Sequence, residues 1–535
     1  MKAKRIITSI LLVLFLCANV LFSACSLVTL NNKAYLNQTV ATAGDVTISM
    51  KDLISGFNSF GYSYTEANGG IYSTKEAVKK TLDDLINREL LVRYSKETYG
   101  ELTITEQNEV YKEVFDYINS QLKTFEEEII KEENLDEVLT DETTSEEKTK
   151  ITEYTKKIER VYNTETHEYE YQRVKENKTE DTELIEFEQV YHGSKELGDK
   201  AMRRFIKQVR NSDDDLKYKS NNEVLEYEIN RAYETYEKNK YITRLQENFE
   251  QNQLVDKDAI VNKYKELVRN SLFTYYYDEA SYNKKMQETA NEVYYQPFGD
   301  KYIQVAHILI KYSDEQKNEI NALKAEKDNY IDPFEYDAKL KEIASNIKTE
   351  DGKSASDLYG EIEVALANAT TTYPTLSEDD ARLKVFLTFV EQYNQDDGMI
   401  SAINSQTQYY SVNLDTSVTD TMIKEFADAS RTLYSEDGRT NFTMYSEPVL
   451  GEYGYHIIFS VGTVKNLVNY ENLDSITAER LYNFPAMKGT NKSMFDKMAE
   501  LVDNADYNEY QASKVLELKE DLTIKYYENV YKKLY

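Results

Sequence analysis

The sequence predicts an α+β protein that is mainly helical and forms strands in one internal segment. Most of the chain places apolar residues or tyrosines three to four positions apart, which is the period of an amphipathic helix. Only 5 prolines occur in 535 residues, so long helices can run uninterrupted. The segments 302–311 and 448–460 have instead the β-branched, apolar composition of strands. A chain of this length is expected to form several domains.

The composition excludes several classes of function. The chain carries 64 Lys and Arg against 95 Asp and Glu, a formal net charge of −31. Because such an acidic chain repels phosphate, we expect no nucleic-acid partner. Apolar residues make up 41% of the chain, which is enough for cores but not for a polytopic membrane protein. Two cysteines, Cys17 and Cys25, both lie near the start, which excludes a disulfide scaffold.

The first 24 residues have the features of a secretory signal peptide. Three basic residues precede an apolar run from Ile6 to Phe22 that ends in small residues. Residues 21–26, Leu-Phe-Ser-Ala-Cys-Ser, resemble a bacterial lipobox, apart from Phe22 in place of the usual leucine. The resemblance implies lipidation of Cys25, a tether over residues 25–39 and a location on the extracytoplasmic face of the cell membrane. An uncleaved N-terminal anchor and plain secretion remain the alternatives.

The mature chain is expected to have no cofactor. Cys25 would be its only cysteine and would carry lipid, so neither thiol chemistry nor a cysteine-ligated metal is expected. Loss of three positive charges with the signal peptide changes the net charge from −31 to −34. No later segment is apolar for long enough to span a bilayer.

The N-terminal region of the mature chain begins with a short β ribbon and continues as helices. The ribbon is expected to turn at Gly44 and Asp45 and to lead into a helix capped by Ser49. Residues 73–76, Ser-Thr-Lys-Glu, form a capping box ahead of apolar residues at helical spacing. A second helix is predicted over 106–133.

Residues 126–200 have a different character and are interpreted as an insertion. The stretch 126–150 is acidic and rich in Thr and Ser, which is typical of solvated chain; metal binding there remains possible in principle. Residues 157–162 and 167–174 favour strands, and 163–166 between them can turn the chain as a β-hairpin.

Helices return after the insertion and again at the end of the chain. Residues 222–250 and 256–273 have helical spacing, as do 466–535, in which 504–534 forms the last helix. Forty-six tyrosines are explained by packing, since the ring can be buried while the hydroxyl stays wet. A tyrosine-lined groove for unfolded chains is the alternative that this explanation leaves open.

Two of the four histidines lie inside apolar strands. Alternation places Ile303, Val305, His307 and Leu309 on one face of the first strand, and His456 lies within the second. A single strand histidine is usually a satisfied core residue. Two histidines that each lie within an apolar strand, in a chain with only four histidines, suggest a shared role.

Four motifs in order resemble the parvulin family of peptidyl-prolyl isomerases. They are Val-Ala-His-Ile-Leu-Ile at 305–310, Tyr-Asn-Gln-Asp at 393–396, Met-Ile-Lys-Glu-Phe-Ala-Asp-Ala at 422–429, and Glu-Pro-Val at 447–449 with Tyr-Gly-Tyr-His-Ile-Ile at 453–458. The resemblance implies a domain over 296–465, built on a small antiparallel sheet flanked by helices. The spacing between the first two motifs is long for the family and implies an insertion at 314–373.

The resemblance also assigns roles to individual residues. Met422 and Phe426, expected one helical turn apart, would form an apolar slot for the proline ring, which Leu414 would complete. Asp396 would lie near the carbonyl or imide nitrogen of the twisted amide. His307 and His456 would tune the pocket through hydrogen bonds rather than carry protons.

Two departures from the parvulin pattern bear on activity. Residues 412–415, Val-Asn-Leu-Asp, lie where the family usually carries Gly-Asp-Leu-Gly, and Gly451 replaces an expected threonine. Only Lys311 is basic near the end of the first strand, so recognition of phosphorylated substrates is not expected.

The remaining chain resembles extracytoplasmic foldases of the PrsA and SurA type. The ribbon, residues 82–91 and residues 255–264 carry this second resemblance. It implies a helical chaperone domain over 40–295, on which residues 466–535 pack, and unfolded or partly folded exported polypeptides as partners. The expected function is a membrane-anchored foldase that isomerises X-Pro bonds. The alternatives are a non-catalytic holdase with a degenerate parvulin domain and a ligand-binding surface lipoprotein.

Overall fold

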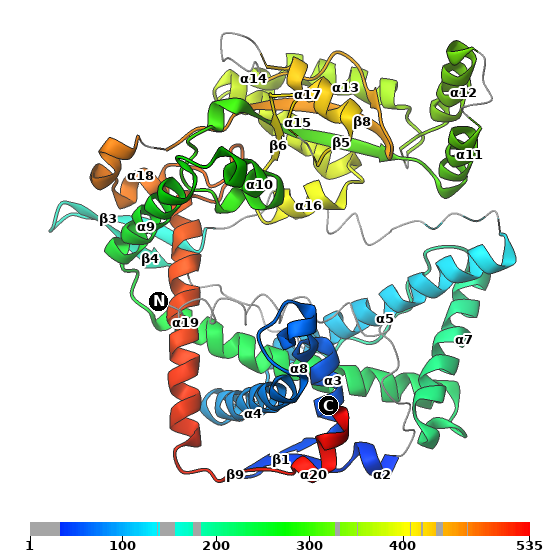
Figure 1. The fold of residues 1–535 in the computed structure, drawn as a ribbon, viewed down its shortest axis with the longest axis vertical. Helices are drawn as coiled ribbons and strands as arrows, with labels where there is room; N and C mark the ends of the chain where they lie inside the picture. The colour runs from blue at the N-terminus through cyan, green and yellow to red at the C-terminus, as the bar shows by residue number, and fades with distance from the viewer. Residues whose placement is uncertain are drawn as a thin grey trace. The chain divides into compact units, whose positions relative to one another are not determined.

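The computed structural model describes residues 33–135, 137, 139, 156–174, 183–326, 332–349, 351–406, 408–418, 421–434, 442–467 and 469–535 (Figure 1). Within them the chain is mainly helical with three small antiparallel sheets, so the predicted α+β class is confirmed. The predicted signal peptide, Cys25 and most of the acidic stretch 126–150 lie outside the described residues.

The described residues form two compact units. The first combines the described parts of Met1–Thr140, Lys175–Gln253 and Asp503–Tyr535, and the second combines those of Asp141–Val174 and Leu254–Val502. Residues 254–295 therefore group with the second unit rather than with the helical region expected over 40–295. The C-terminal region 466–535 is divided between the two units: residues up to Val502 belong to the second unit, and residues from Asp503 belong to the first.

The first unit contains the predicted ribbon. Strands β1 (Thr39–Ala43) and β2 (Val46–Ser49) pair antiparallel, and Gly44 between them has a φ of 59°, which side-chain-bearing residues rarely adopt. Ser49 caps α3 (Met50–Ser59) through a complete capping box. The predicted turn and cap are both confirmed.

A third strand joins this sheet from the other end of the chain, and the sequence prediction there is wrong in part. Residues 504–534 were expected to be helical, but α19 (Met494–Lys519) ends before β9 (Ile524–Tyr526). β9 pairs antiparallel with β1, and a short helix α20 (Glu528–Tyr531) follows. Three residues are too few for a periodic pattern to indicate a strand. The backbone N–H and C=O groups of β9 form their hydrogen bonds with β1, which is distant in the sequence.

Long capped helices make up the rest of the first unit. Ser73, Thr103 and Ser220 each complete a capping box, as the sequence predicts for Ser73. α5 runs through the expected start of the insertion at 126, and Ile129 is buried there. The helices are α2 (Lys33–Leu36), α4 (Thr74–Tyr99), α5 (Ile104–Glu133), α7 (Lys195–Ser212) and α8 (Asn221–Asn252).

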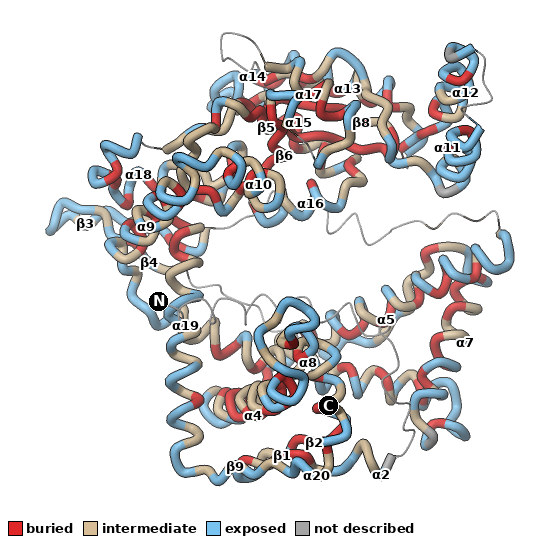
Figure 2. The backbone as a smooth tube through the Cα atoms, viewed as in Figure 1, coloured by how far each residue is buried: buried red, intermediate tan, exposed pale blue. Residues whose placement is uncertain are grey.

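The second unit is built around a four-stranded sheet with the order β6-β5-β8-β7, in which every neighbouring pair is antiparallel. Figure 2 shows that its two long central strands are almost entirely buried. The strands are β5 (Tyr302–Lys311), β6 (Tyr410–Asn413), β7 (Val449–Leu450) and β8 (Gly454–Thr463). The predicted strand over 302–311 is confirmed. The single strand expected over 448–460 is wrong in part, because residues 451–453 turn the chain and β7 folds back to pair antiparallel with β8.

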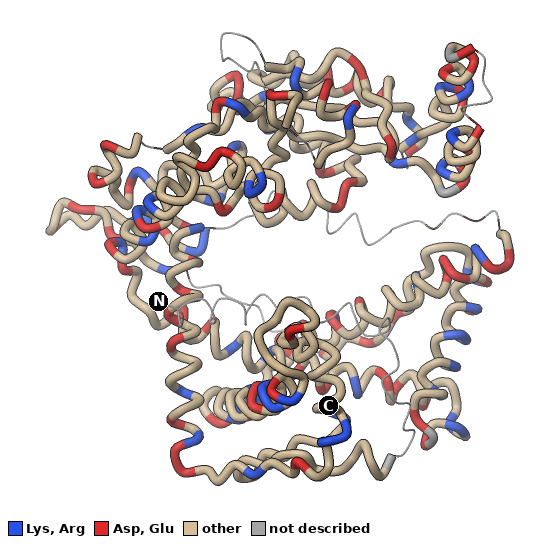
Figure 3. The backbone as a smooth tube through the Cα atoms, in the orientation of Figure 1, with Lys and Arg blue, Asp and Glu red and all other residues tan. Residues whose placement is uncertain are grey.

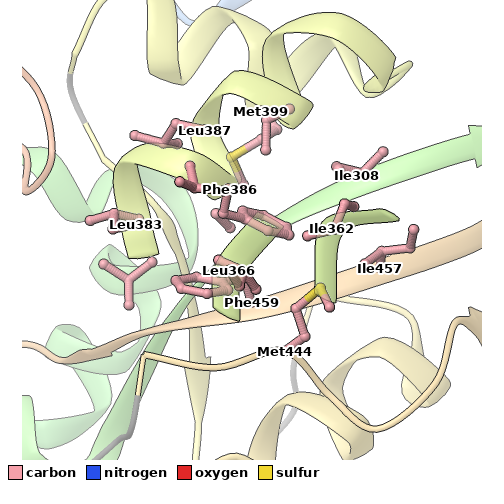
Figure 4. Packing of buried hydrophobic residues seen from close by; sticks show 14 of the residues in the cluster. Ile308, Ile362, Leu366, Leu383, Phe386, Leu387, Met399, Met444, Ile457 and Phe459 are labelled. Carbon is pink, nitrogen blue, oxygen red and sulfur yellow. The ribbon is translucent and has the colours of Figure 1, made fainter. Parts of the chain in front are cut away.

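One face of this sheet is covered by helices. Phe386 of α15 stacks on Phe459 of β8, with ring centroids 4.6 Å apart, and Ile362 of α13 is buried in the same cluster (Figure 4). α13 lies within the expected insertion at 314–373, so part of that segment belongs to the core. The helices between β5 and β7 are α11 (Asp314–Ala325), α12 (Pro333–Ser345), α13 (Ala355–Ala367), α14 (Ala369–Thr372), α15 (Glu378–Tyr393), α16 (Asp397–Asn404) and α17 (Lys424–Thr432).

A smaller cluster of the second unit contains the predicted hairpin. β3 (Ile158–Asn163) and β4 (Glu168–Arg173) pair antiparallel around the predicted turn. They pack with α9 (Lys257–Tyr275), α18 (Ala478–Tyr482) and the start of α19, and Tyr171 stacks on Phe495 at 4.5 Å. α10 (Glu279–Thr289) follows α9 and leads toward β5.

Acidic and basic residues are interspersed along the helices of each unit (Figure 3). Several form ion pairs one helical turn apart, such as Lys195 with Asp199 and Arg93 with Glu97. Within the described ranges, none of the helices is both long and apolar enough to cross a membrane.

Candidate functional site

The two strand histidines meet on the face of the sheet opposite Phe386. In the β5–β8 register His307 lies opposite Ile458, and His456 lies opposite Leu309, so the two histidines are diagonal neighbours on one face. Their rings stack with centroids 5.2 Å apart, and their Nδ1 atoms are 3.1 Å apart. Both side chains are buried.

Asp396 is placed by a loop that borders β5. β6 pairs with β5 only as far as Val305, which leaves the backbone of β5 beyond this residue open on that side. There the Leu309 N–H donates to Asn394 Oδ1 at 2.8 Å, and the Gln395 N–H donates to the Leu309 carbonyl at 3.0 Å. The loop therefore holds Asp396 beside His307.

The three residues form one chain of hydrogen bonds. His307 Nε2 lies 2.7 Å from Asp396 Oδ2, which also accepts the Tyr410 hydroxyl at 2.8 Å, while the Gly398 N–H donates to Asp396 Oδ1 at 3.0 Å. Both ring nitrogens of His307 are therefore engaged, Nε2 with Asp396 and Nδ1 with Nδ1 of His456.

This chain fixes the charge of the site. Burial opposes ionisation of Asp396, but the hydrogen bonds from His307 and Tyr410 outweigh it and lower the pKa of Asp396 to about 2. Burial raises the pKa of Tyr410, as does the adjacent Asp396 charge. Burial and the neighbouring His307 lower the pKa of His456 to about 3. At neutral pH the site therefore holds a carboxylate, a phenol and a neutral imidazole of His456.

One nitrogen of the site lacks a hydrogen-bond partner. His456 Nε2 is buried, and no group among the described residues bonds to it. A Cβ atom added at Gly451 would lie 3.0 Å from this nitrogen. The same Cβ atom would overlap Ile423 Cδ1, so a threonine at position 451 would fit only if the Ile423 side chain moved.

The apolar part of the site lies directly beside the histidines. Phe426 of α17 contacts the ring of His307 edge to face, with centroids 5.0 Å apart, and the ring of His456 at 5.4 Å. Phe426 is only 2% exposed, so it forms the floor of the site. Leu414 and Met422 are partly buried and pack against the same cluster.

The predicted helical pairing of Met422 with Phe426 is wrong. α17 begins at Lys424, because Ile423 has an extended backbone with φ −59° and ψ 143°. The first intrahelical bond runs from the Ala427 N–H to the Ile423 carbonyl. Met422 therefore reaches the cluster from the segment before the helix and not from its face.

The structure brings His307, His456 and Asp396 together, with the three predicted apolar residues packed beside them. Sequence reasoning missed Tyr410, whose hydroxyl donates to Asp396. With 46 tyrosines in the chain, only its position at the start of a short strand could have indicated it. The described residues contain no group of three or more His, Cys, Asp or Glu arranged to hold a metal ion.

Comparison of the chain with protein-family models and with curated proteins found no match.

Acidification is expected to destabilise the second unit through His456. The folded state does not protonate this ring until about pH 3, whereas the unfolded chain protonates it near its ordinary pKa of 6.5. The contribution of the neutral His456 ring to the free energy of unfolding is therefore fully present above pH 6.5. It falls as the pH decreases toward 3, by up to about 2 kcal/mol between pH 6.5 and 5. Urea unfolding followed by circular dichroism at both pH values measures the change.

The matched variant is His456→Gln, which cannot take up this proton. We expect its free energy of unfolding to depend less steeply on pH than that of the wild type over the same range. Equal pH dependence in the two proteins would contradict the assignment of a buried neutral His456.

Proposed function

We propose that the second unit is a parvulin-type peptidyl-prolyl cis-trans isomerase and that the whole protein is an extracytoplasmic foldase of the PrsA type. The observation that carries the proposal is the single hydrogen-bonded chain of His456, His307 and Asp396 beside Phe426. These residues come from all four motifs that resemble parvulins. The antiparallel sheet flanked by helices is also what that resemblance implies.

The geometry suits a reaction in which no bond is broken. Amide resonance sets a barrier of about 18–20 kcal/mol to rotation about the X-Pro bond. In the twisted state the nitrogen regains its lone pair and the carbonyl oxygen loses charge. Met422 and Leu414, above the floor formed by Phe426, hold the proline ring in an apolar setting.

Asp396 acts on this twisted amide by its charge. Its carboxylate stays ionised and partly exposed, at 22% of its side-chain surface, next to the apolar slot. A fixed charge that stabilises the redistributed charge of the twisted amide lowers the barrier without reorganising during the reaction. His307, Tyr410 and His456 are positioning residues. Hydrogen bonds from His307 and Tyr410 hold Asp396, and the two histidine rings pack against Phe426.

We further propose that the protein is held at the membrane by lipid on Cys25 and receives exported polypeptides before they fold. Large apolar side chains exposed on the first unit are available to contact unfolded chains; they include Ile71, Tyr218 and Leu516. Metabolic labelling with palmitate tests the anchor, and a Cys25→Ser variant that still takes up label would contradict it.

A protease-coupled assay of a proline-containing peptide tests the isomerase. Wild type is expected to accelerate isomerisation above the buffer rate, and the Asp396→Ala, Met422→Ala double variant to lose about 10²-fold or more of that acceleration. The control is Asp397→Ala, because Asp397 neighbours Asp396 in sequence but is 94% exposed and pairs with Lys311 at 3.5 Å.

A non-catalytic holdase is the second candidate, and the unpaired His456 Nε2 favours it. An incomplete hydrogen-bond network would leave the site less rigid than an active enzyme requires. If wild type and the double variant both give the buffer rate while both suppress aggregation of a denatured client, the protein is a holdase.

A further inference from the structure

A second cavity of the second unit lies on the sheet face opposite the histidines. It has a volume of about 740 Å³ and is separate from the candidate isomerase site, since none of the residues assigned to that site lines it. Gln304 reaches it from β5, on the face opposite Ile303 and Val305. The polar side chains that line this Lys497 cavity include Asn291, Gln296, Gln304, Gln408, Lys488 and Lys497.

Lys497, in the first turn of α19, has an unusual environment. Its Nζ donates to the Asn291 carbonyl at 2.7 Å and lies 4.9 Å from the centroid of the Tyr294 ring. Burial, together with the nearby Lys492, lowers the pKa of Lys497 to about 8. One carbonyl satisfies only one of the three N–H groups of the ammonium.

The two carboxylates whose charges act on Lys497 are already paired with other lysines. Glu292 pairs with Lys285, and Glu500 pairs with Lys492 at 2.6 Å. Over the described ranges Lys497 therefore has no carboxylate partner of its own. A partly buried ammonium without a counter-charge is costly, so the cavity favours an anionic occupant.

Lys488 adds a second ammonium to the same cavity. Its Nζ lies 3.8 Å from the centroid of the Phe442 ring, and burial lowers its pKa against the opposing effect of Asp380 and Asp379. Both aspartates also line the cavity, and so does a third lysine, Lys465, so the lining carries three ammonium groups against two carboxylates. No arginine occurs among the described lining residues, which disfavours a phosphate because arginine forks bind that group best.

The walls between these polar groups are apolar and aromatic. Met286, Phe442, Met487 and Met494 line the cavity together with the polar residues. A ligand that fits this cavity has one negative charge that pairs with Lys497 and an apolar body that packs against these walls. It also has amide groups that form hydrogen bonds with the glutamines.

We propose that the Lys497 cavity binds a small organic carboxylate with an apolar or aromatic body. The ligand's carboxylate replaces the missing counter-charge of Lys497, while its body displaces water from the methionine and phenylalanine side chains. The site is independent of the isomerase site and of the function proposed for it.

Isothermal titration calorimetry on the full chain tests the proposal with two probes of nearly equal size. N-acetyl-L-phenylalanine carries the carboxylate, and N-acetyl-L-phenylalaninamide replaces it with a neutral amide. We expect the acid to bind the wild type about tenfold or more tightly than the amide. Failure of the acid to bind, or equal affinity for both probes, would overturn the proposal without any variant.

Three variants locate the effect. Lys497→Met is expected to abolish the preference for the acid, Lys497→Arg to retain it, and Lys195→Met to leave it unchanged, since Lys195 is 74% exposed on α7. The Asp396→Ala, Met422→Ala variant is expected to bind the acid like the wild type, which separates this site from the isomerase. A folded Lys497→Met protein that still prefers the acid would contradict the assignment.

Discussion

Truncating Phe386 to alanine is expected to lower the free energy of unfolding of the second unit by about 3–5 kcal/mol. Phe386 has no exposed surface, and its ring stacks on Phe459 between α15 and β8. Truncation removes the buried ring and leaves a cavity that the flanking helix and strand can close only partly. Urea unfolding combined with hydrogen exchange of peptides from β5 and β8 reports on this unit specifically.

The matched control is Phe334→Ala, in the same unit. Phe334 lies in the first turn of α12 and is 79% exposed, so its truncation is expected to change stability by about 0.5 kcal/mol or less. Similar losses in the two variants would show that the Phe386–Phe459 stack does not stabilise the sheet.

Replacing His307 by alanine is expected to cost about 2–4 kcal/mol, for a different reason. The change removes the hydrogen-bond partners of Asp396 Oδ2 and of His456 Nδ1 at once. It also opens a space beside Phe426, whose edge contacts the His307 ring. The loss of stability is expected to appear in the urea unfolding of the second unit, together with loss of the proposed isomerase activity.

His167→Asn supplies the control for this experiment. His167 lies in the turn of the β3–β4 hairpin, is exposed, and has a φ of 57°, which asparagine tolerates. We expect no measurable change in stability from it. A His307→Ala protein as stable as this control would mean that the hydrogen-bonded chain does not contribute to the fold.

Much of the local structure could be predicted because neighbouring residues encode it. The ribbon turn at Gly44, the caps at Ser49 and Ser73 and the β3–β4 hairpin each depend on a few adjacent residues. The limits of prediction were also local. The extended backbone of Ile423 makes α17 begin at Lys424, after Met422. β9 has only three residues, which are too few to show the two-residue period of a strand.

For the candidate site, the resemblance of four motifs predicted which residues take part but not how they contact one another. Nothing in the sequence indicated that Tyr410 would bond to Asp396, or that Gly451 would lie against an unpaired nitrogen of His456. The Lys497 cavity was not predicted either, since its lining comes from α9, β5, β8 and α19.

By itself, the sequence determined the mainly helical class, the acidic net charge, and the position of several elements, such as α4, α5, α8, α9 and β5. These properties depend on composition and on periods of two to four residues. The tertiary structure alone decided that β9 joins β1, that Asp396 reaches His307 across 89 positions, and that His456 reaches it across 149. Such contacts depend on how the burial of apolar faces brings distant segments together, and local periodicity contains no information about which segments will meet.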